Sequence, residues 1–412
     1  MKQSLKQFFE VLRVSNARNI FGAQVISDFG DWFYFVAIMA LIYENFGSVG
    51  VGLYMTIRYQ PTITLTPFAG VIADRFPKKA VMIFSDVVRG ICMIFLGVIA
   101  AGVIESTFLT AALLILSAFT SVLFRPARMA LLPQLVSKEI RLSLNALDGT
   151  FSTLALTLAP ALGGLFLAEF DKSLLFFINA MSFFISALLV YLVRFNEQIK
   201  SKASLPDYFN DLKQGTIYLF KNWPILQMTF VYTLSHIGVG ATFVFISSLA
   251  IERLAVGEEG IGFLMTVLGL GSVLGLVAAG SVKESSSKKV AVLSIGTFGF
   301  FILALAHIPY MIPALILLFG MGVLANVAEP PLWTFFQNST LEEYHGRVFA
   351  MIDTISIIGL MIGSSLCGWF LDYYSFSMAL SIIGASMILP LIMGILFFSK
   401  SKASLPSSET LK

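Results

Sequence analysis

Long apolar runs alternate with short polar breaks along almost the whole chain. Each run is about 20 residues long, the length that an α-helix needs to cross the hydrocarbon core of a bilayer. Splitting the chain at charges and turn residues predicts twelve spans, at residues 17–43, 49–73, 81–102, 107–128, 142–168, 173–194, 225–250, 259–281, 289–308, 311–335, 346–371 and 376–398. Helices satisfy their own backbone hydrogen bonds in lipid, so the pattern predicts an all-α membrane protein with 12 transmembrane helices.

The charges in the predicted loops are distributed unevenly between the two sides of the membrane. Loops on one side carry nearly all the bases: Arg75, Lys78, Lys79, Lys138, Arg141, Arg194, Lys200, Lys202, Lys213, Lys221, Lys283, Lys288, Lys289 and Arg347. Loops on the other side carry mainly acids: Glu44, Glu105, Glu169, Asp171, Glu252, Glu258, Glu259 and Asp372. Because Lys and Arg accumulate in cytoplasmic loops, both termini are expected in the cytoplasm.

The composition agrees with lipid as the main solvent. Of the 412 residues, 57% are hydrophobic and 12% are charged, whereas a soluble domain carries about 25% charged residues. The two cysteines, Cys92 and Cys367, lie inside apolar runs, which favours small buried side chains over a disulfide framework or a metal site. The net charge of +3 comes from bases in loops and does not indicate nucleic-acid binding. The chain has no nucleotide-binding loop and only three histidines, so we expect no enzyme activity and no cofactor.

An internal repeat divides the chain into two parts. The stretch Gly50–Thr56 (GVGLYMT) matches Gly260–Thr266 (GIGFLMT). At the same offset, four residues of one polar loop recur in another: Gly70, Asp74, Lys78 and Lys79 match Gly280, Glu284, Lys288 and Lys289. Two matches at one offset are hard to produce by chance, so we predict two parallel six-helix halves.

The polar segments place the boundaries of these halves. The N-terminal half is expected at residues 1–194 and the C-terminal half at 225–398. A cytoplasmic linker at 195–224 joins them, and a cytoplasmic tail follows at 399–412. Apolar residues recur at mostly helical spacing among the charges of the linker, which predicts an amphipathic helix on the cytoplasmic face, either as a tether or as part of a gate.

The polar loop between the second and third spans has a distinctive pattern. Gly70 is followed by Asp74-Arg75 and then by Lys78-Lys79. Together with the two parallel halves and the central linker, this pattern resembles the major facilitator superfamily over nearly the whole chain. Further stretches resemble its twelve-helix exporter branch, which includes macrolide-efflux and siderophore-export proteins: Ser27–Asp31, Asp86–Arg89, Arg125–Arg128, Asn145–Leu147 and Pro160–Gly164. The resemblance implies a protein of the bacterial inner membrane.

Four ionisable residues lie deep inside the predicted spans: Asp28, Asp31, Arg58 and His236. A charge near the bilayer centre costs about 2.5–3.5 kcal/mol, so each is expected to face a partner or a water-filled cavity. Asp28 and Asp31 share one helical face and Arg58 lies at a similar depth, which predicts an Asp31–Arg58 pair. The pair can carry protons or contact substrate, or it can be a permanent brace. His236 is a candidate proton relay or a packing residue.

A further set of polar residues lies near the cytoplasmic ends of the spans. The resemblance implies that these residues latch the two halves together while the site opens outward, and simple anchoring of loops is the alternative. The predicted latch consists of Gly70, Asp74, Arg75, Lys78, Lys79, Asp86, Arg89, Arg125, Arg128, Asp148, Glu329 and Asp353.

Small residues suggest close approach of helices. Pro160, Gly163 and Gly164 resemble the end of the antiporter motif of the superfamily. Glycines also form stripes in the eighth span, at 262, 269, 271, 275 and 280, and in the eleventh, at 359, 363 and 368. Such stripes predict close helix packing, with sliding during transport as the alternative.

The expected function is that of a secondary active transporter. The resemblance favours a monomeric, proton-coupled exporter of amphipathic small molecules such as drugs or siderophores, in contact with membrane lipid and working by alternating access. A lysophospholipid flippase or an uptake symporter on the same fold is the first alternative. A membrane receptor that transports nothing is the second, and it is disfavoured because buried acids are costly to retain without a use.

Overall fold

The protein is described by a computed structural model over residues 14–136, 141–194 and 205–398. Within these ranges the side chains of a smaller set are not described: residues 66–67, 69–75, 133, 141–150, 153, 205–209, 211–212, 284, 389–390 and 392–398. The predicted tail and the first part of the predicted linker therefore lie outside the described residues.

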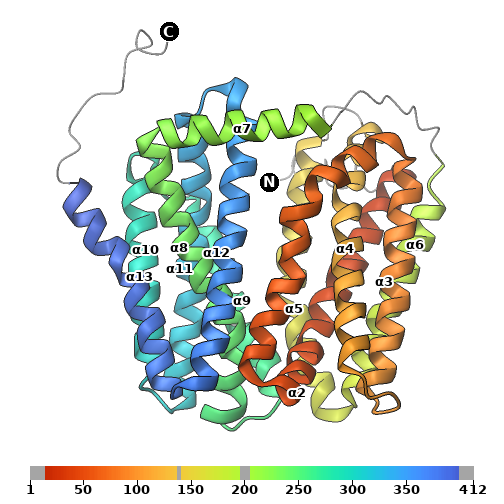
Figure 1. Cartoon of the computed structure of the whole chain (residues 1–412), viewed down its shortest axis with the longest axis horizontal. Helices are drawn as coiled ribbons and strands as arrows, with labels where there is room; N and C mark the ends of the chain where they lie inside the picture. The colour runs from red at the N-terminus through yellow and green to blue at the C-terminus, as the bar shows by residue number, and fades with distance from the viewer. Residues whose placement is uncertain (1–13, 137–140, 195–204, 399–412) are drawn as a thin grey trace.

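The described chain forms two helical bundles that stand side by side (Figure 1). The N-terminal half contains α2 (Ser15–Arg75), α3 (Lys78–Ala100), α4 (Thr107–Leu131), α5 (Arg141–Glu169) and α6 (Lys172–Tyr191). The C-terminal half contains α8 (Trp223–Ser248), α9 (Glu259–Ala279), α10 (Ser287–Leu305), α11 (Met311–Ser339), α12 (His345–Tyr373) and α13 (Phe376–Phe398). Because α2 bends and supplies two spans, the prediction of an all-α fold with 12 transmembrane helices in two halves is confirmed. Nine of the described helices are long and apolar enough to cross a membrane.

The bend in α2 replaces a loop that the sequence predicted at residues 44–48. Gly47 has φ 60° and ψ −160°, and helical geometry resumes directly after it. A positive φ of this kind is accessible to glycine at little cost. The carboxylate of Asp372, at the end of α12, accepts a hydrogen bond from the Ser48 backbone N–H at 3.1 Å. The turn is therefore held by the opposite half of the molecule.

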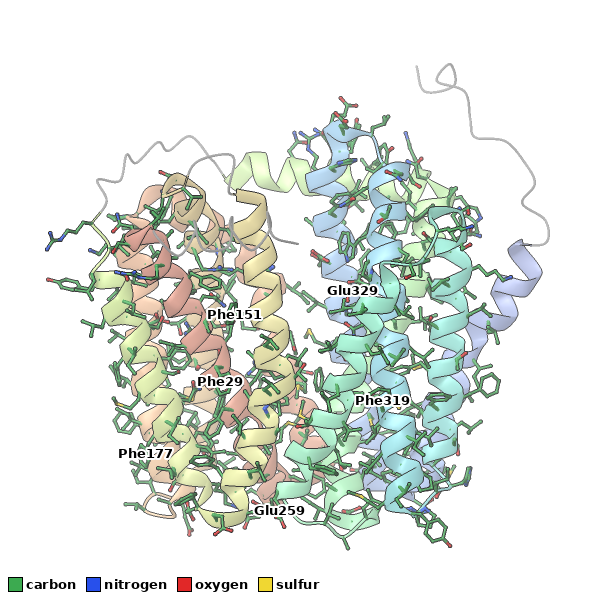
Figure 2. The ribbon with its side chains drawn as sticks, turned by 180° about the vertical axis from the view of Figure 1, so that it is seen from behind. Phe29, Phe151, Phe177, Glu259, Phe319 and Glu329 are labelled. Carbon is green, nitrogen blue, oxygen red and sulfur yellow. The ribbon has the colours of Figure 1, made fainter. Side chains whose placement is uncertain are left out.

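The two ends of the bundle carry opposite charges. At the basic end lie residues such as Lys79, Arg194, Lys221, Lys288 and Arg347, and α7 (Leu205–Lys221) runs across it (Figure 1). At the acidic end lie Glu44, Asp171, Glu258 and Asp372. Figure 2, seen from behind, shows Glu259 at the acidic end of α9.

The linker helix α7 is attached to the C-terminal half. Gly215 packs so closely on α12 that a Cβ built there would lie 2.7 Å from the Arg347 carbonyl oxygen. Arg347 donates a hydrogen bond to Gln214 Oε1 at 2.7 Å, and the ring of Tyr218 stacks on Tyr344 with centroids 4.5 Å apart. These contacts fix α7 beside the start of α12.

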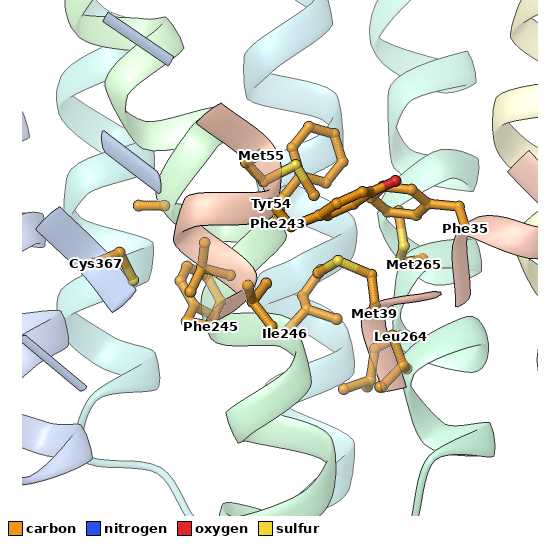
Figure 3. Close-up of a cluster of buried hydrophobic side chains, with 14 of the residues drawn as sticks. Phe35, Met39, Tyr54, Met55, Phe243, Phe245, Ile246, Leu264, Met265 and Cys367 are labelled. Carbon is orange, nitrogen blue, oxygen red and sulfur yellow. The ribbon is translucent and has the colours of Figure 1, made fainter. Parts of the chain in front are cut away.

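The largest buried core is shared by both halves, and the part in which the halves meet lies toward the acidic end. Figure 3 shows side chains of α2 in contact with those of the C-terminal half, among them Phe35, Met39, Tyr54, Met55, Phe243, Phe245, Ile246, Leu264, Met265 and Cys367. A second, smaller cluster belongs to the N-terminal half alone and includes Ile20, Phe21, Met82, Leu131 and Val190. The halves are therefore joined by apolar packing at the acidic end.

Two helix crossings, which we call the inter-half seam, bring backbones of the two halves together: α2 with α12 and α5 with α9. A Cβ built on Gly52 would lie 2.6 Å from the Ser364 carbonyl oxygen, and one built on Gly262 would lie 2.4 Å from that of Pro160. Gly52 and Gly262 occupy the same position in the two copies of the repeated stretch. The repeat therefore marks equivalent points of contact between the halves, where only glycine allows the observed approach.

Ion pairs and a hydrogen bond also hold the two halves together at the acidic end. Lys172, at the start of α6, pairs with Glu44 of its own half and with Glu258 of the other half, the latter at 3.4 Å. The Tyr43 hydroxyl donates to Glu252 Oε1, which also joins the two halves. The preceding residue, Asp171, caps α6 by accepting from the backbone N–H of Ser173 at 2.8 Å, and this hydrogen bonding lowers the pKa of the Asp171 carboxyl.

Candidate functional site

A polar cavity of about 210 Å³ lies inside the N-terminal half. Both spans of α2, together with α3 and α4, line it, and its polar wall includes Asp31, Tyr34, Tyr54, Arg58, Arg89 and Ser121. A water-accessible space around an acid and two bases explains how α2 and α3 can carry charges inside a membrane protein. Two of the four deep ionisable residues picked out in the sequence, Asp31 and Arg58, meet here.

Asp31 belongs to a buried charge network with Arg89 and Asp86. Arg89 lies between the two carboxylates, 3.6 Å from Asp31 Oδ2 and 2.5 Å from Asp86 Oδ1. Asn179 donates to Asp31 at 3.4 Å, and Ser186 donates to Asp86 at 2.6 Å. The side chain of Asp31 is 26% exposed whereas that of Asp86 is 0% exposed. Asp31 is therefore the carboxylate of the network that the cavity can reach.

The predicted Asp31–Arg58 ion pair is wrong. Arg58 donates instead to the Tyr54 hydroxyl at 3.2 Å, and its guanidinium lies over the rings of Trp32 and Phe35, 5.9 and 5.4 Å from their centroids. The two charges face the same cavity, but Arg89 occupies the position beside the carboxylate. Depth along a helix does not specify which neighbouring helix a side chain meets, so the sequence alone could not exclude this arrangement.

Asp28 lies outside this cavity wall and contacts a different helix. Its carboxylate accepts hydrogen bonds from Gln24, one turn earlier in α2, and from Ser152 of α5 at 3.0 Å. Hydrogen bonds to neutral groups hold this acid, whereas Asp31 is held by an arginine. The two acids therefore share a helical face, as predicted, but have separate partners.

A second cavity, of about 220 Å³, lies in the C-terminal half and includes the predicted residue His236. Its wall contains Tyr232, Phe243, Met265, Phe298 and Glu329 in addition. His236 Nδ1 lies 3.0 Å from the Tyr232 carbonyl oxygen, which can only accept, so this nitrogen donates. The Tyr232 hydroxyl donates to Glu329 Oε1 at 3.3 Å. Leu156 of α5 also lines the cavity, which therefore faces the N-terminal half.

Three members of the predicted latch lie deeper than the sequence suggested. Helix α3 begins at Lys78, so Asp86 and Arg89 are more than two turns inside it, in the network with Asp31. Helix α11 continues to Ser339, and Glu329 reaches the cavity of the C-terminal half. They lie further from the helix ends than predicted because α3 begins before, and α11 ends after, the predicted spans, and their role as a latch stays a prediction.

Two other latch residues, Arg125 and Asp353, come from opposite halves and lie near the basic end. Arg125 of α4 is the positive charge that acts on Asp353 of α12, yet the two side chains form no ion pair and both are exposed. The acidic end is closed, whereas these two latch candidates do not join the halves at the basic end.

The remaining latch residues fall into three groups. Lys79 donates to the Val193 carbonyl oxygen at 2.9 Å, a contact inside the N-terminal half that agrees with loop anchoring. Lys78 and Arg128 are buried, with 6% and 3% exposed. The side chains of the last group lie outside the described residues, so their role stays a prediction: Gly70, Asp74, Arg75 and Asp148.

The antiporter-like residues lie at helix crossings. A Cβ on Gly163 would lie 2.4 Å from the Phe33 carbonyl oxygen, and one on Gly164 would lie 2.7 Å from that of Glu259. Pro160 supplies the carbonyl that meets Gly262 at the inter-half seam. The three residues therefore place α5 against α2 on one side and α9 on the other.

Sequence reasoning missed several polar residues of the two cavities. Asn179 and Ser186 of α6 hold the acids of the network, and Tyr232 holds Glu329. A signal was present, because an asparagine inside an apolar span needs a hydrogen-bond partner. Within the described ranges, no group of three His, Cys, Asp or Glu side chains is arranged to hold a metal ion.

Comparison with known proteins gives matches over nearly the whole chain. Residues 20–233 and 228–411 each match the family model described as Major Facilitator Superfamily. The uncharacterized MFS-type transporter YfiS of Bacillus subtilis is 25% identical over 90% of each chain. Macrolide efflux protein A of Streptococcus pyogenes is 22% identical over 82% of this chain and 84% of its own. The enterobactin exporter EntS of Shigella boydii is 25% identical over 77% and 76%.

The fold is also found among solved structures. The crystal structure of the nucleoside transporter NupG superposes with a TM-score of 0.76 at 12% identity, over 95% of this chain and 100% of that one. At this identity the similarity concerns the fold alone. The predicted resemblance to the exporter branch is confirmed by the sequence relatives.

Proposed function

Since the chain belongs to the Major Facilitator Superfamily and is an integral membrane transporter, we propose that it exports amphipathic small molecules in exchange for protons, by alternating access. Export is supported by two relatives whose names describe efflux or export. The proposal places the protein in the bacterial inner membrane, as a monomer surrounded by lipid, with both termini in the cytoplasm.

The observation that carries the proton coupling is the network of Asp31, Arg89 and Asp86. Two carboxylates share one guanidinium, and only Asp31 is accessible from the cavity. Protonation of Asp31 would remove its attraction to Arg89 and leave the Arg89–Asp86 contact intact. Asp31 can therefore bind and release a proton without exposing an unpaired arginine, which is what a proton carrier inside a membrane needs.

The distribution of contacts supports a state closed toward the acidic side. The inter-half seam, Lys172 and Tyr43 join the halves at the acidic end, while Arg125 and Asp353 remain apart near the basic end. With the basic end in the cytoplasm, this arrangement is inward-facing. Reversal of these contacts would open the opposite side, as alternating access requires.

The membrane voltage gives a scale for the coupling. One charge that crosses 100 mV contributes about 2.3 kcal/mol, and 1.4 kcal/mol corresponds to a factor of 10. A single proton exchanged per neutral substrate would therefore support a roughly fiftyfold gradient from the voltage alone.

The test is substrate efflux from proteoliposomes with an imposed proton gradient. A panel of macrolides, cationic dyes, siderophores and lysophospholipids is measured with and without an uncoupler. We expect wild-type protein to expel at least one class and Asp31→Asn to lose gradient-driven transport. Glu105→Gln, an exposed acid in the α3–α4 loop, serves as the matched control and should behave as wild type.

Four results would separate the alternatives. Undiminished, gradient-driven efflux by a folded Asp31→Asn variant would refute the proton role of Asp31. Movement of lysophospholipid alone would favour a flippase, and accumulation of a nutrient in intact cells would favour a symporter. The absence of any flux would favour a receptor.

A further inference from the structure

We propose that the cavity of the C-terminal half binds the cationic group of an amphipathic substrate, with Glu329 as the counter-charge. This inference rests on the transport function proposed above and specifies the chemical class of its substrate. Figure 2 shows Glu329 within the bundle, on α11, further from the basic end than the end of the helix and nearer to it than Phe319.

The charge of the cavity wall is the first argument. Glu329 is the one carboxylate among the described residues that line the cavity, and none of these residues is Lys or Arg. Its described polar contact is the Tyr232 hydroxyl, a neutral donor at 3.3 Å. An ionised carboxylate in such a wall is poorly compensated by the protein, so a ligand cation would gain a full ion pair on binding.

The histidine in the wall adds an acceptor. Because His236 Nδ1 donates to the Tyr232 carbonyl, the neutral ring keeps a lone pair on Nε2. A protonated amine has hydrogens to donate to such an acceptor, whereas an anion would have only repulsion from Glu329. The polar groups of this wall therefore select for positive charge.

The apolar part of the wall suits a cation with aromatic or aliphatic bulk. The rings of Tyr232, Phe243 and Phe298 line the cavity, and a cation that lies over an aromatic face is attracted by the negative charge density of the ring. Met265 and Met387 supply flexible, polarizable surface that can adapt to ligands of different shape. Such a wall accepts a lipophilic cation better than a small hydrated ion.

The cavity of the N-terminal half does not share this preference. Arg58 and Arg89 line it, and its one wall carboxylate, Asp31, is already beside Arg89. A substrate cation would meet two guanidinium groups there. We therefore assign a different task to each half. Asp31, beside Arg89, lies in the site for a proton, and Glu329 lies in the site for a cationic substrate, whose wall contains no Lys or Arg among the described residues.

Equilibrium binding of radiolabelled tetraphenylphosphonium to the purified full-length protein tests the proposal without any gradient. We expect saturable binding to wild type and at least a tenfold loss of affinity in Glu329→Gln, as removal of one ionic contact predicts. Glu329→Asp keeps the charge and should stay within about threefold of wild type, because only one methylene is lost. The control Glu105→Gln should not change the affinity. Triphenylphosphine oxide, an uncharged molecule of similar aromatic bulk, should compete poorly.

Each contrary result overturns the proposal. These results are the absence of saturable binding to folded wild type, equal affinity in Glu329→Gln, or equal competition by the uncharged oxide. The competition by the uncharged oxide is measured on wild type alone, so it tests the preference for positive charge even if Glu329→Gln fails to fold. Since no proton gradient is present, a failure of the Asp31 experiment leaves this result unaffected.

Discussion

The inter-half seam predicts that one added methyl group will change which side of the transporter is open. Gly262 of α9 lies against the backbone of α5, and a Cβ at this position would be 2.4 Å from the Pro160 carbonyl oxygen and 2.6 Å from the Gly164 Cα. Both obstructing atoms are backbone, so neither can rotate away. Gly262→Ala should therefore force α5 and α9 apart at the acidic end.

The free-energy cost of the added methyl group can be taken from measured effects of overpacking. Inserting a methyl group into a packed interface costs about 1–3 kcal/mol. The cost applies to the state in which the seam is closed and is relieved when it opens. The ratio of open to closed protein should thus rise about 5- to 150-fold, so a population of about 1% open would become about 5% to 60%.

Distances between spin labels measure this population directly. Labels at Val103 and Tyr310, which are 74% and 70% exposed, report the separation of the halves at the acidic end. The native cysteines, Cys92 and Cys367, are buried and are replaced first. We expect Gly262→Ala to increase the fraction of long distances.

A matched control separates opening from general destabilisation. Gly299→Ala places a Cβ 2.8 Å from the Gly384 carbonyl oxygen, a similar clash between α10 and α13 inside one half. It should lower thermal stability and leave the distance distribution unchanged. The reasoning is refuted if Gly262→Ala leaves the distribution as in wild type, or if both variants change it equally.

Two further predictions concern the charged residues at the two ends. Lys172→Gln removes the 3.4 Å contact to Glu258, and because a partly exposed ion pair near the membrane surface contributes only about 1 kcal/mol, the same label distances should shift less than with Gly262→Ala. A larger shift would contradict the dominance of backbone packing. Asp74→Asn tests the predicted latch: the ratio of inward to outward accessibility of engineered cysteines should change, and an unchanged ratio would reject its role.

The membrane architecture could be predicted from the sequence because lipid imposes simple rules on length and polarity. The runs of about 20 apolar residues predicted the spans, and the repeat that places Gly52 and Gly262 at equivalent positions predicted the two halves. The bend at Gly47 was not predicted, since its conformation is completed by Asp372, which lies far away in the chain.

The pairing of the buried charges could not be predicted in the same way. Hydrophobic pattern gives the depth of Asp31 in the membrane, but its partner depends on how α3 is rotated against α2. The contact of Arg89 with Asp31 could therefore not be read from the sequence. Glu329 lies further from the end of its helix than predicted for another reason. The predicted span ended at residue 335, where the apolar run stops, whereas α11 continues to Ser339.

The seam between the halves is built from glycine Cα atoms and carbonyl oxygens, whereas the walls of both cavities consist mainly of side chains. Substitutions at wall positions outside the core that the halves share, such as Glu329 and His236, can therefore alter what is carried without disturbing the surfaces that move against each other. A protein assembled in this way can acquire a new cargo by a few exchanges around Glu329 and keep the same mechanics. Its range of substrates and its conformational cycle can thus diverge independently between related transporters.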